Sequence, residues 1–249
     1  MSTPLSDRSP LARTEVVLVS YRSRSHVEEL IAGWPSDLSI VVVDNAGNVD
    51  GLAELSAAHS NVRYVDGGGQ GFGRAANLGA FSSTKDFLVF VNPDCRPTAT
   101  HLEALVVGVA SDDSAASHAA TMTGHDGSIE AGVGGWEPSL RRLTVHALGL
   151  GWVFRKAGLF AFPTPGEHSA VDWTTGACLA TRADRFRELG GFDESFYVMP
   201  RTSASAAAPG WPASGRCCGR TSWCGTGRAV RAPHRWRCCG CAGRPSPAI

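Results

Sequence analysis

The last fifty residues of the chain, Pro200–Ile249, contain no lysine, no aspartate and no glutamate. The same stretch holds eight arginines and six of the chain's eight cysteines. A single globular domain is not expected to change composition so sharply along its length. We therefore expect one folded domain over 15–199, followed by an Arg-, Cys-, Pro- and Gly-rich tail over 200–249 that is disordered.

Cysteine is scarce before the tail, where only Cys95 and Cys178 occur. This scarcity argues against a disulfide framework and favours a reducing compartment. Long apolar runs are also missing, because the first fifteen residues have no apolar core of signal-peptide length and no later run could span a bilayer. We expect a cytoplasmic protein that at most touches the inner face of the plasma membrane.

An excess of basic charge is absent from the body of the chain. The formal net charge is zero, with 23 basic and 23 acidic residues, but eight of the basic residues lie in the tail. Residues 1–200 therefore hold 15 basic against 23 acidic residues, a balance of −8. This balance argues against a nucleic-acid partner.

The body of the chain alternates short apolar runs with helical segments. The expected strands are Glu15–Ser20, Leu38–Asp44, Val62–Val65 and Phe87–Asn92. The expected helices are Ser25–Ala32, Asn48–Ala58 and Phe72–Ser82. This alternation predicts an α/β fold with a mostly parallel central sheet flanked by helices, preceded by a disordered leader over 1–14.

Polar residues follow three of the expected strands. They are Ser20 and Tyr21, Asp44 and Asn45, and the run 92–94. Ligands of open parallel sheets bind beyond the carboxyl ends of the strands. We therefore expect these three strand ends to line one crevice.

Two loops in this region can bind a nucleotide. The Asp44 carboxylate can accept a hydrogen bond from a ribose hydroxyl or a base N–H, or it can cap the next helix. The glycine-rich run 67–80, GGGQGFGRAANLGA, can cradle a phosphate because glycines let backbone N–H groups approach an anion at a helix start. Since this run does not follow the first strand, it is not interpreted as an NAD fingerprint.

The run FLVFVNPDC, Phe87–Cys95, is the most specific local signal. It delivers Asn92 and Asp94 to the crevice, and Pro93 ends the strand between them. A carboxylate at this point can hold Mg²⁺ or Mn²⁺, which neutralises a diphosphate leaving group. The alternative is a turn in which Asp94 bonds only local backbone.

With these segments in order, the chain resembles family 2 glycosyltransferases of the GT-A fold, in their rhamnosyltransferase-like branch. The resemblance rests on VSYRS, VVVDN, GQGFGRAANLGA, FVNPD and WTTGACLATRADRFRELGGFDESFYVM, spread over 15–199. It implies a nucleotide-diphospho-sugar donor, a polyprenyl-linked or glycan acceptor, and Mg²⁺ or Mn²⁺ as cofactor. The implied nucleotide-binding residues are Ser20, Tyr21, Asp44, Arg74 and Asn77, the metal residue is Asp94, and the acceptor residues are Trp173, Gly176 and Ala177.

The catalytic base implied by this resemblance is missing. An inverting transfer needs a base that deprotonates the acceptor hydroxyl. Family members carry it in an E-D-x-x-L motif a few residues after the F-D-E loop, where this chain has P-R-T-S-A-S. Asp193 and Glu194 are the nearest carboxylates, although the resemblance makes them structural or acceptor-binding.

The stretch Leu140–Phe162 mixes Arg141, Arg142, Arg155 and Lys156 with aromatic residues. Such a stretch can lie at a membrane interface and receive a polyprenyl-diphosphate acceptor. It can also be an ordinary cover helix whose basic side chains reach into solvent. Both interpretations remain open at the level of sequence.

The tail has three interpretations. Its cysteines lack the paired C-x-x-C spacing of a zinc site, and its arginines suit RNA or anionic lipid. A frameshift accounts for more, because GC-rich codons for Pro200–Ser205, read from the last base of the proline codon, encode E-D-V-G-L. That is the missing base motif at the position where it is due.

These features leave three functions to compare. The first is a hexosyltransferase of the rhamnosyl type for cell-envelope glycan synthesis. The second is a nucleotide-sugar-binding remnant that transfers nothing. The third is an anion- or metal-binding protein that acts through its tail.

Overall fold

The computed structural model of the chain describes residues 9–123, 129, 133–154, 157–161, 169–194 and 226–229. The strands are β1 (Thr14–Ser20), β2 (Ser39–Asp44), β3 (Val62–Asp66), β4 (Phe87–Val91), β5 (Ser117–Ala120), β6 (Gly134–Gly135), β7 (Ala170–Val171), β8 (Trp173–Thr174), β9 (Cys178–Arg182) and β10 (Thr226–Ala229). The helices are α1 (Arg24–Gly33), α2 (Leu52–Ala57), α3 (Phe72–Phe81), α4 (Ala99–Ser111), α5 (Leu140–Ala147) and α6 (Ala183–Glu188), with short 3-10 turns η1 (Pro10–Arg13) and η2 (Leu150–Trp152).

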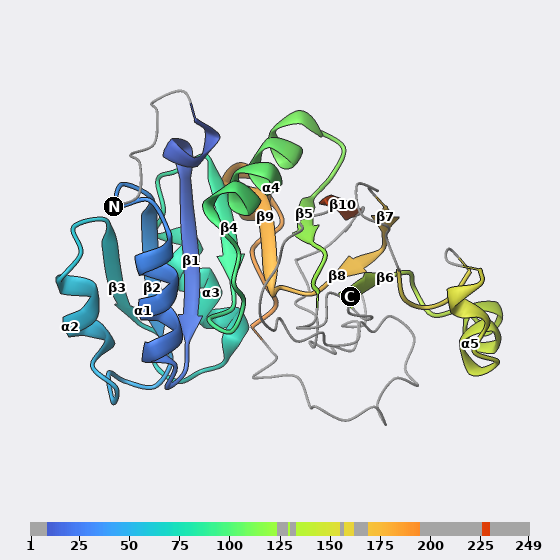
Figure 1. Cartoon of the computed structure of the whole chain (residues 1–249), viewed down its shortest axis with the longest axis horizontal. Coiled ribbons are helices and arrows are strands. Elements are labelled where there is room, and N and C mark those ends of the chain that lie inside the picture. The colour runs from blue at the N-terminus through green and yellow to red at the C-terminus, as the bar shows by residue number, and fades with distance from the viewer. Residues whose placement is uncertain are drawn as a thin grey trace, which may run out of the picture.

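Eight strands form one sheet in the order β3-β2-β1-β4-β9-β5-β10-β7 (Figure 1). The four strands from β3 to β4 are parallel, and β9 joins β4 in the antiparallel direction. The predicted α/β class, with a mostly parallel sheet flanked by helices, is confirmed. Strands β6 and β8 form a separate antiparallel pair.

Each face of the sheet has its own buried cluster, because alternate strand residues point to opposite faces. One cluster joins Val16 and Leu18 of β1 to apolar residues of α1, α2 and α4. The other joins Val17 and Val41 to alanines of α3 and to Phe186 of α6. Figure 1 shows α1 and α4 in front of the sheet and α3 behind it. Strands β1, β2 and β4 are therefore covered on both faces, which is why they read as apolar runs, whereas the edge strand β3 is only partly buried.

The four predicted strands form with their ends within one residue of the expected positions. Helix α2 is shorter than expected and begins only at Leu52. Asn48 and Gly51 have φ angles of 60° and 75°, in the left-handed region, so a right-handed helix cannot include them.

Order begins earlier than the expected Glu15. The turn η1 precedes β1, and Leu11 within it is buried. The Ser9 hydroxyl donates to the Glu103 carboxylate of α4 at 2.9 Å. The expected leader is therefore corrected from Ser9 onward, while residues 1–8 lie outside the described part of the chain.

Part of the tail forms a strand, which departs from the expected disorder. Strand β10, within the tail, pairs with β5 and β7, so these four residues are not disordered. The rest of the tail lies outside the described residues. Cys178, one of the two cysteines before the tail, is a buried free cysteine. Among the described residues, no helix is long and apolar enough to cross a bilayer.

Candidate functional site

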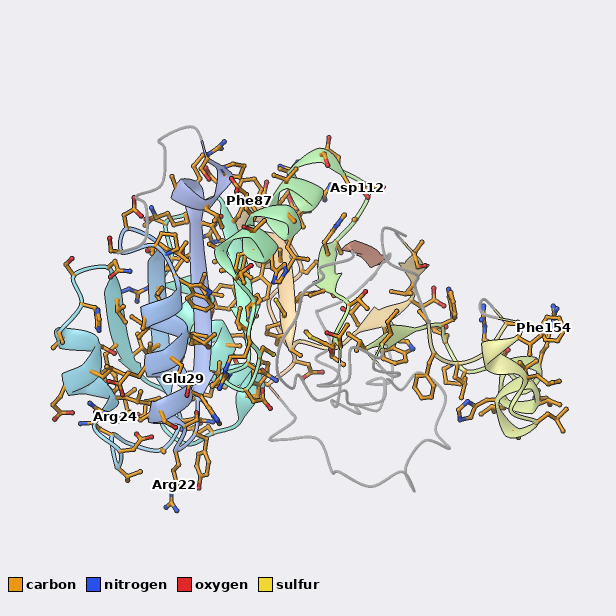
Figure 2. The ribbon with its side chains drawn as sticks, in the orientation of Figure 1. Arg22, Arg24, Glu29, Phe87, Asp112 and Phe154 are labelled. Atoms are coloured by element: carbon orange, nitrogen blue, oxygen red, sulfur yellow. The ribbon has the colours of Figure 1, made fainter. Side chains whose placement is uncertain are left out.

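The strand order creates a switch point between β1 and β4. The chain moves from β1 outward to β2 and β3, then returns to β4 on the other side of β1. The carboxyl ends of β1 and β4 are adjacent at this point, where open α/β sheets bind their ligands. Figure 2 shows Arg22 at this carboxyl end of the sheet, opposite the end marked by Phe87 and Asp112. The crevice is where the sequence predicts the nucleotide.

The register brings the predicted residues to this edge. Ser20 is paired with Asp44, and Leu18 is paired with Val91 at the end of β4. Neighbouring strands lie about 4.8 Å apart, so the ends of β2, β1 and β4 are adjacent. Polar residues predicted from three separate motifs are therefore neighbours at one edge.

Asp44 is fully buried, and both of its carboxylate oxygens are occupied by the protein. Oδ1 accepts from the Ala46 amide at 2.8 Å, and Oδ2 accepts from the Asn48 amide and from the Tyr64 hydroxyl, the latter at 3.1 Å. Burial, with the charge of Asp44 beside it, raises the pKa of Tyr64 to about 12. The structure thus shows Asp44 shaping the loop after β2, and it does not cap α2, whose N-cap is Gly51. Direct contact with a nucleotide stays a prediction.

Ser20 and Tyr21 differ in their access to the crevice. Ser20 is buried, and its hydroxyl lies 2.7 Å from the hydroxyl of Ser23. Tyr21 is 60% exposed, and the guanidinium of Arg22 lies 5.6 Å from the centre of its ring. Arg22 has a φ of 52°, a left-handed conformation that is uncommon for arginine. The open aromatic face at this edge is therefore that of Tyr21.

The glycine-rich loop runs from the end of β3 to the start of α3. Gly68, Gly69 and Gly71 have positive φ angles between 64° and 99°. A side chain on Gly67 would lie 3.0 Å from the Asp44 carbonyl oxygen, so the loop packs directly on the end of β2. Helix α3 starts without a side-chain cap or an acidic residue in its first turn, and Arg74 there is exposed. This arrangement leaves the first turn suited to an anion.

Asn77 was predicted to lie near the base or phosphate, but its amide group has other partners. It is buried, and its Oδ1 accepts from the Phe192 amide at 2.8 Å. Its Nδ2 donates to the Phe192 carbonyl and to the Glu194 carboxylate, each at 2.9 Å. These three bonds use both N–H donors and one of the two acceptor positions of the Asn77 amide, and a contact of Asn77 with the nucleotide stays a prediction. Asn77 therefore holds the F-D-E loop on α3.

The two weak candidates for the base lie on that same loop. Glu194 is exposed and bound to Asn77, and the Asp193 carbonyl packs against Gly73, where an added Cβ would approach to 3.0 Å. The ring of Phe192 anchors the loop, 4.9 Å from the ring of Phe90 in β4. These contacts hold the loop against α3 and β4, and the structural or acceptor-binding role that the resemblance implies for Asp193 and Glu194 stays a prediction.

The turn predicted to bind the metal and the motif predicted to bind the acceptor lie next to each other. The Asn92 amide donates to the Ala177 carbonyl at 2.8 Å, next to the pair of Val91 with Cys178. This bond places Gly176 and Ala177 against the turn that carries the exposed Asp94. Trp173 lies further along, and its indole N–H donates to the Trp136 carbonyl at 3.2 Å.

Asp94 is the donor that the sequence offers for a divalent cation. The described residues contain no group of three or more His, Cys, Asp or Glu side chains able to hold a metal. Mg²⁺ is commonly bound through one or two carboxylates, with substrate phosphate oxygens and water completing the shell. A single exposed carboxylate beside the crevice fits that mode.

Sequence reasoning missed Tyr64 and Trp136. Tyr64 occupies a β3 position paired with Val42, and only its place beside Asp44 shows its role. Trp136 receives the indole N–H of Trp173 across a sequence separation of 37 residues. No local pattern marks either residue, because both act through contacts that the fold creates.

The sheet, with helices on both faces, defines an α/β protein of the glycosyltransferase class. The family model of glycosyl transferase family 2 matches residues 16–158, and the chain belongs to that family. This membership agrees with the predicted GT-A fold.

The chain is similar to the N-acetylglucosaminyl-diphospho-decaprenol L-rhamnosyltransferase of Mycobacterium tuberculosis, with 28% identity over 208 residues. The match covers 74% of this chain and 66% of that protein, so the chain spans just under two thirds of its relative.

Solved structures with similar outlines include the mannosyltransferase PcManGT of Pyrobaculum calidifontis in complex with GDP-Man and Mn²⁺. It is 19% identical, with a TM-score of 0.47 over 73% of this chain and 48% of that one. TarS of S. aureus is 15% identical, with a TM-score of 0.46 over 74% of this chain and 51% of that one.

Proposed function

We propose that this chain is the donor-binding part of an inverting glycosyltransferase. It takes a hexose of the rhamnose type from a nucleotide diphosphate and serves a polyprenyl-linked or polysaccharide acceptor in cell-envelope synthesis. The observation that carries the proposal is the junction at Asn92 and Ala177, where the predicted metal turn meets the predicted acceptor motif. The match to a rhamnosyltransferase named for a diphospho-decaprenol substrate supports this acceptor class.

Each predicted site residue has its own part in binding the donor. Tyr21 offers its exposed ring to the base, while Ser20 and Asp44 fix the loops that surround it. Arg74 and the first turn of α3 face the diphosphate. Asp94 would hold Mg²⁺ or Mn²⁺, which when bound neutralises charge on the leaving diphosphate.

Catalysis needs a base that this chain does not offer in the expected motif. Glu194 is tethered to Asn77, which favours a structural role over proton abstraction. The second candidate function is therefore a donor-binding protein that transfers nothing. The sequence favours this second candidate, since the predicted donor-site residues are present and the expected base motif is absent.

Calorimetry with nucleoside diphosphates, in the presence and absence of Mn²⁺, tests the site. We expect binding that Mn²⁺ strengthens, and we expect Asp94→Ala to remove the effect of the metal. Asp184→Ala is the matched control, because Asp184 is an exposed carboxylate on α6 that bonds its own neighbour Arg185. Equal metal dependence in both variants would refute the assignment of Asp94.

Peripheral contact with the inner face of the plasma membrane and a cytoplasmic location remain predictions, as does the absence of a nucleic-acid partner. Anion or zinc binding by the tail also stays a prediction, because its cysteines lie outside the described residues. Zinc analysis of the full chain, compared with a chain ending at Met199, measures that alternative.

A further inference from the structure

Helix α5 does not bury its leucines: its half-buried residues are Arg142 and Val145, whereas Leu140 and Leu143 are exposed. The guanidinium of Arg142 lies 5.0 Å from the ring centre of Trp136 and donates to the Gly158 carbonyl at 3.0 Å. The ring of His146 meets that of Phe160 edge-on at 5.3 Å. An ordinary cover helix instead turns its apolar stripe inward and its polar face outward.

The exposed residues of this segment include several large apolar side chains beside Arg141, Thr144 and His146. We define the α5 patch by its exposed large apolar side chains, which are Leu140, Leu143, Leu148, Leu150, Val153 and Phe154. Leu140 is 86% exposed and Phe154 is 55% exposed. Figure 1 shows α5 projecting from the end of the molecule farthest from β3, and Figure 2 shows Phe154 on the same projection. A gathered apolar surface of this kind indicates a binding surface.

The charge around the patch is of one sign. No acidic residue occurs between Glu137 and Glu167, whereas Arg141, Arg142, Arg155 and Lys156 fall in that interval. This contrasts with residues 1–200 as a whole, where acidic residues exceed basic ones by eight. Exposed apolar side chains beside the exposed Arg141, in a stretch of sequence without acidic residues, match the surface of a bilayer that contains anionic lipids.

The patch is connected to the acceptor side of the molecule. Trp173 donates to the Trp136 carbonyl, and its ring meets that of Phe160 at 6.0 Å. Trp136 and Phe160 are the two residues on which Arg142 and His146 of α5 rest. The residue predicted to face the acceptor is thus one contact removed from the base of α5.

We propose that the α5 patch docks the protein on an anionic bilayer surface and so presents the acceptor side to a lipid-linked substrate. Docking itself rests on the patch alone, whereas its purpose rests on the proposed function. The apolar side chains enter the boundary between headgroups and acyl chains, and the exposed Arg141 contacts anionic headgroups.

Sedimentation of the full chain with vesicles tests the proposal. We expect binding to vesicles that contain phosphatidylglycerol, and weaker binding to neutral phosphatidylcholine vesicles and at high salt. Leu140→Asp combined with Phe154→Asp should lower the partition coefficient at least about tenfold. Arg141→Gln should lower it about fivefold, the effect of one cation near an anionic surface.

Val107→Asp is the matched control, because Val107 is 47% exposed on α4, outside the patch. Equal vesicle binding by the control and the double variant would overturn the proposal. So would a wild-type dimer that the double variant abolishes while vesicle binding stays unchanged, since the patch would then join two copies. Calorimetry with nucleoside diphosphates should give the same affinity for all variants, so a failed donor site and a failed docking surface are distinguishable.

Discussion

Asn77 of α3 and Phe192 of the F-D-E loop are joined by two hydrogen bonds between one side-chain amide and one backbone residue, 115 positions apart. Both bonds are buried. They tie the loop to the helix whose first turn faces the crevice. A side chain at Gly191 would approach the Asn77 Oδ1 to 2.5 Å, so the glycine permits this close packing.

Asn77→Ala should destabilise the protein by about 1–3 kcal/mol, because the Phe192 amide and carbonyl would lose buried partners. Urea denaturation followed by circular dichroism measures the change. Gln70→Ala, at an exposed position in the glycine-rich loop, is the control and should have little effect. A loss of nucleotide affinity with unchanged stability would instead restore the predicted nucleotide contact for Asn77.

Asp44→Asn should destabilise the protein by about 1–3 kcal/mol, because it weakens the acceptance of the Ala46 and Asn48 amides in a buried site. It should also weaken binding of nucleoside diphosphates, since the loop after β2 loses its organiser. Asp66→Asn is the matched control at the end of β3, where the exposed carboxylate accepts one amide, from Gly68. Equal losses of stability in the two variants would argue against a special role for Asp44.

Tyr64 should titrate late. Its pKa is raised from 10.0 to about 12, first by burial and then by the charge and hydrogen bond of Asp44. The pKa of Tyr64 is higher in the folded protein than in the unfolded chain. Its contribution to the free energy of unfolding is therefore complete below pH 10 and is lost as the pH rises through about 12. Tyrosinate absorbance should show this late titration, and Asp44→Asn should bring it to lower pH. A titration unchanged by that substitution would exclude Asp44 as a cause.

The sequence predicted best what depends on short apolar runs. β1, β2 and β4 were found because strands covered on both faces read as apolar runs. The polar residues at their ends followed, since parallel strands carry them to one edge. The role of Asp44 could not be predicted in the same way. Capping and ligand binding need the same carboxylate, and only the fold decides which partner that carboxylate meets.

Contacts between residues far apart in the chain could not be predicted from the sequence. Asn77 sits in a glycine-rich helix start that resembles a phosphate loop, yet its partner is distant in the chain. The stretch from Leu140 was recognised as basic and aromatic, but only the contacts of Arg142 and His146 reveal which side faces outward. Periodicity gives the angle between residues on a helix and leaves its orientation to packing.

The missing base motif leads to the last prediction, which concerns the reading frame after Met199. Sequencing the coding DNA tests the frameshift hypothesis. An uninterrupted frame for E-D-V-G-L means that the printed tail is not translated, whereas the frame as printed means a genuine lesion. A DNA sequence that cannot encode the motif in any frame would contradict the hypothesis.

Restoring that frame should raise the rate of sugar transfer by about 10²–10⁴-fold over the chain as printed, because a positioned general base contributes an effect of this size. Affinity for nucleoside diphosphates should change little, since the predicted donor-site residues all precede Met199. The matched control is the restored chain with the glutamate and aspartate of E-D-V-G-L changed to glutamine and asparagine, which keeps the restored fold and removes the base. Should the printed chain transfer sugar as fast as the restored one, the base lies elsewhere, and Asp193→Asn and Glu194→Gln become the variants that identify it.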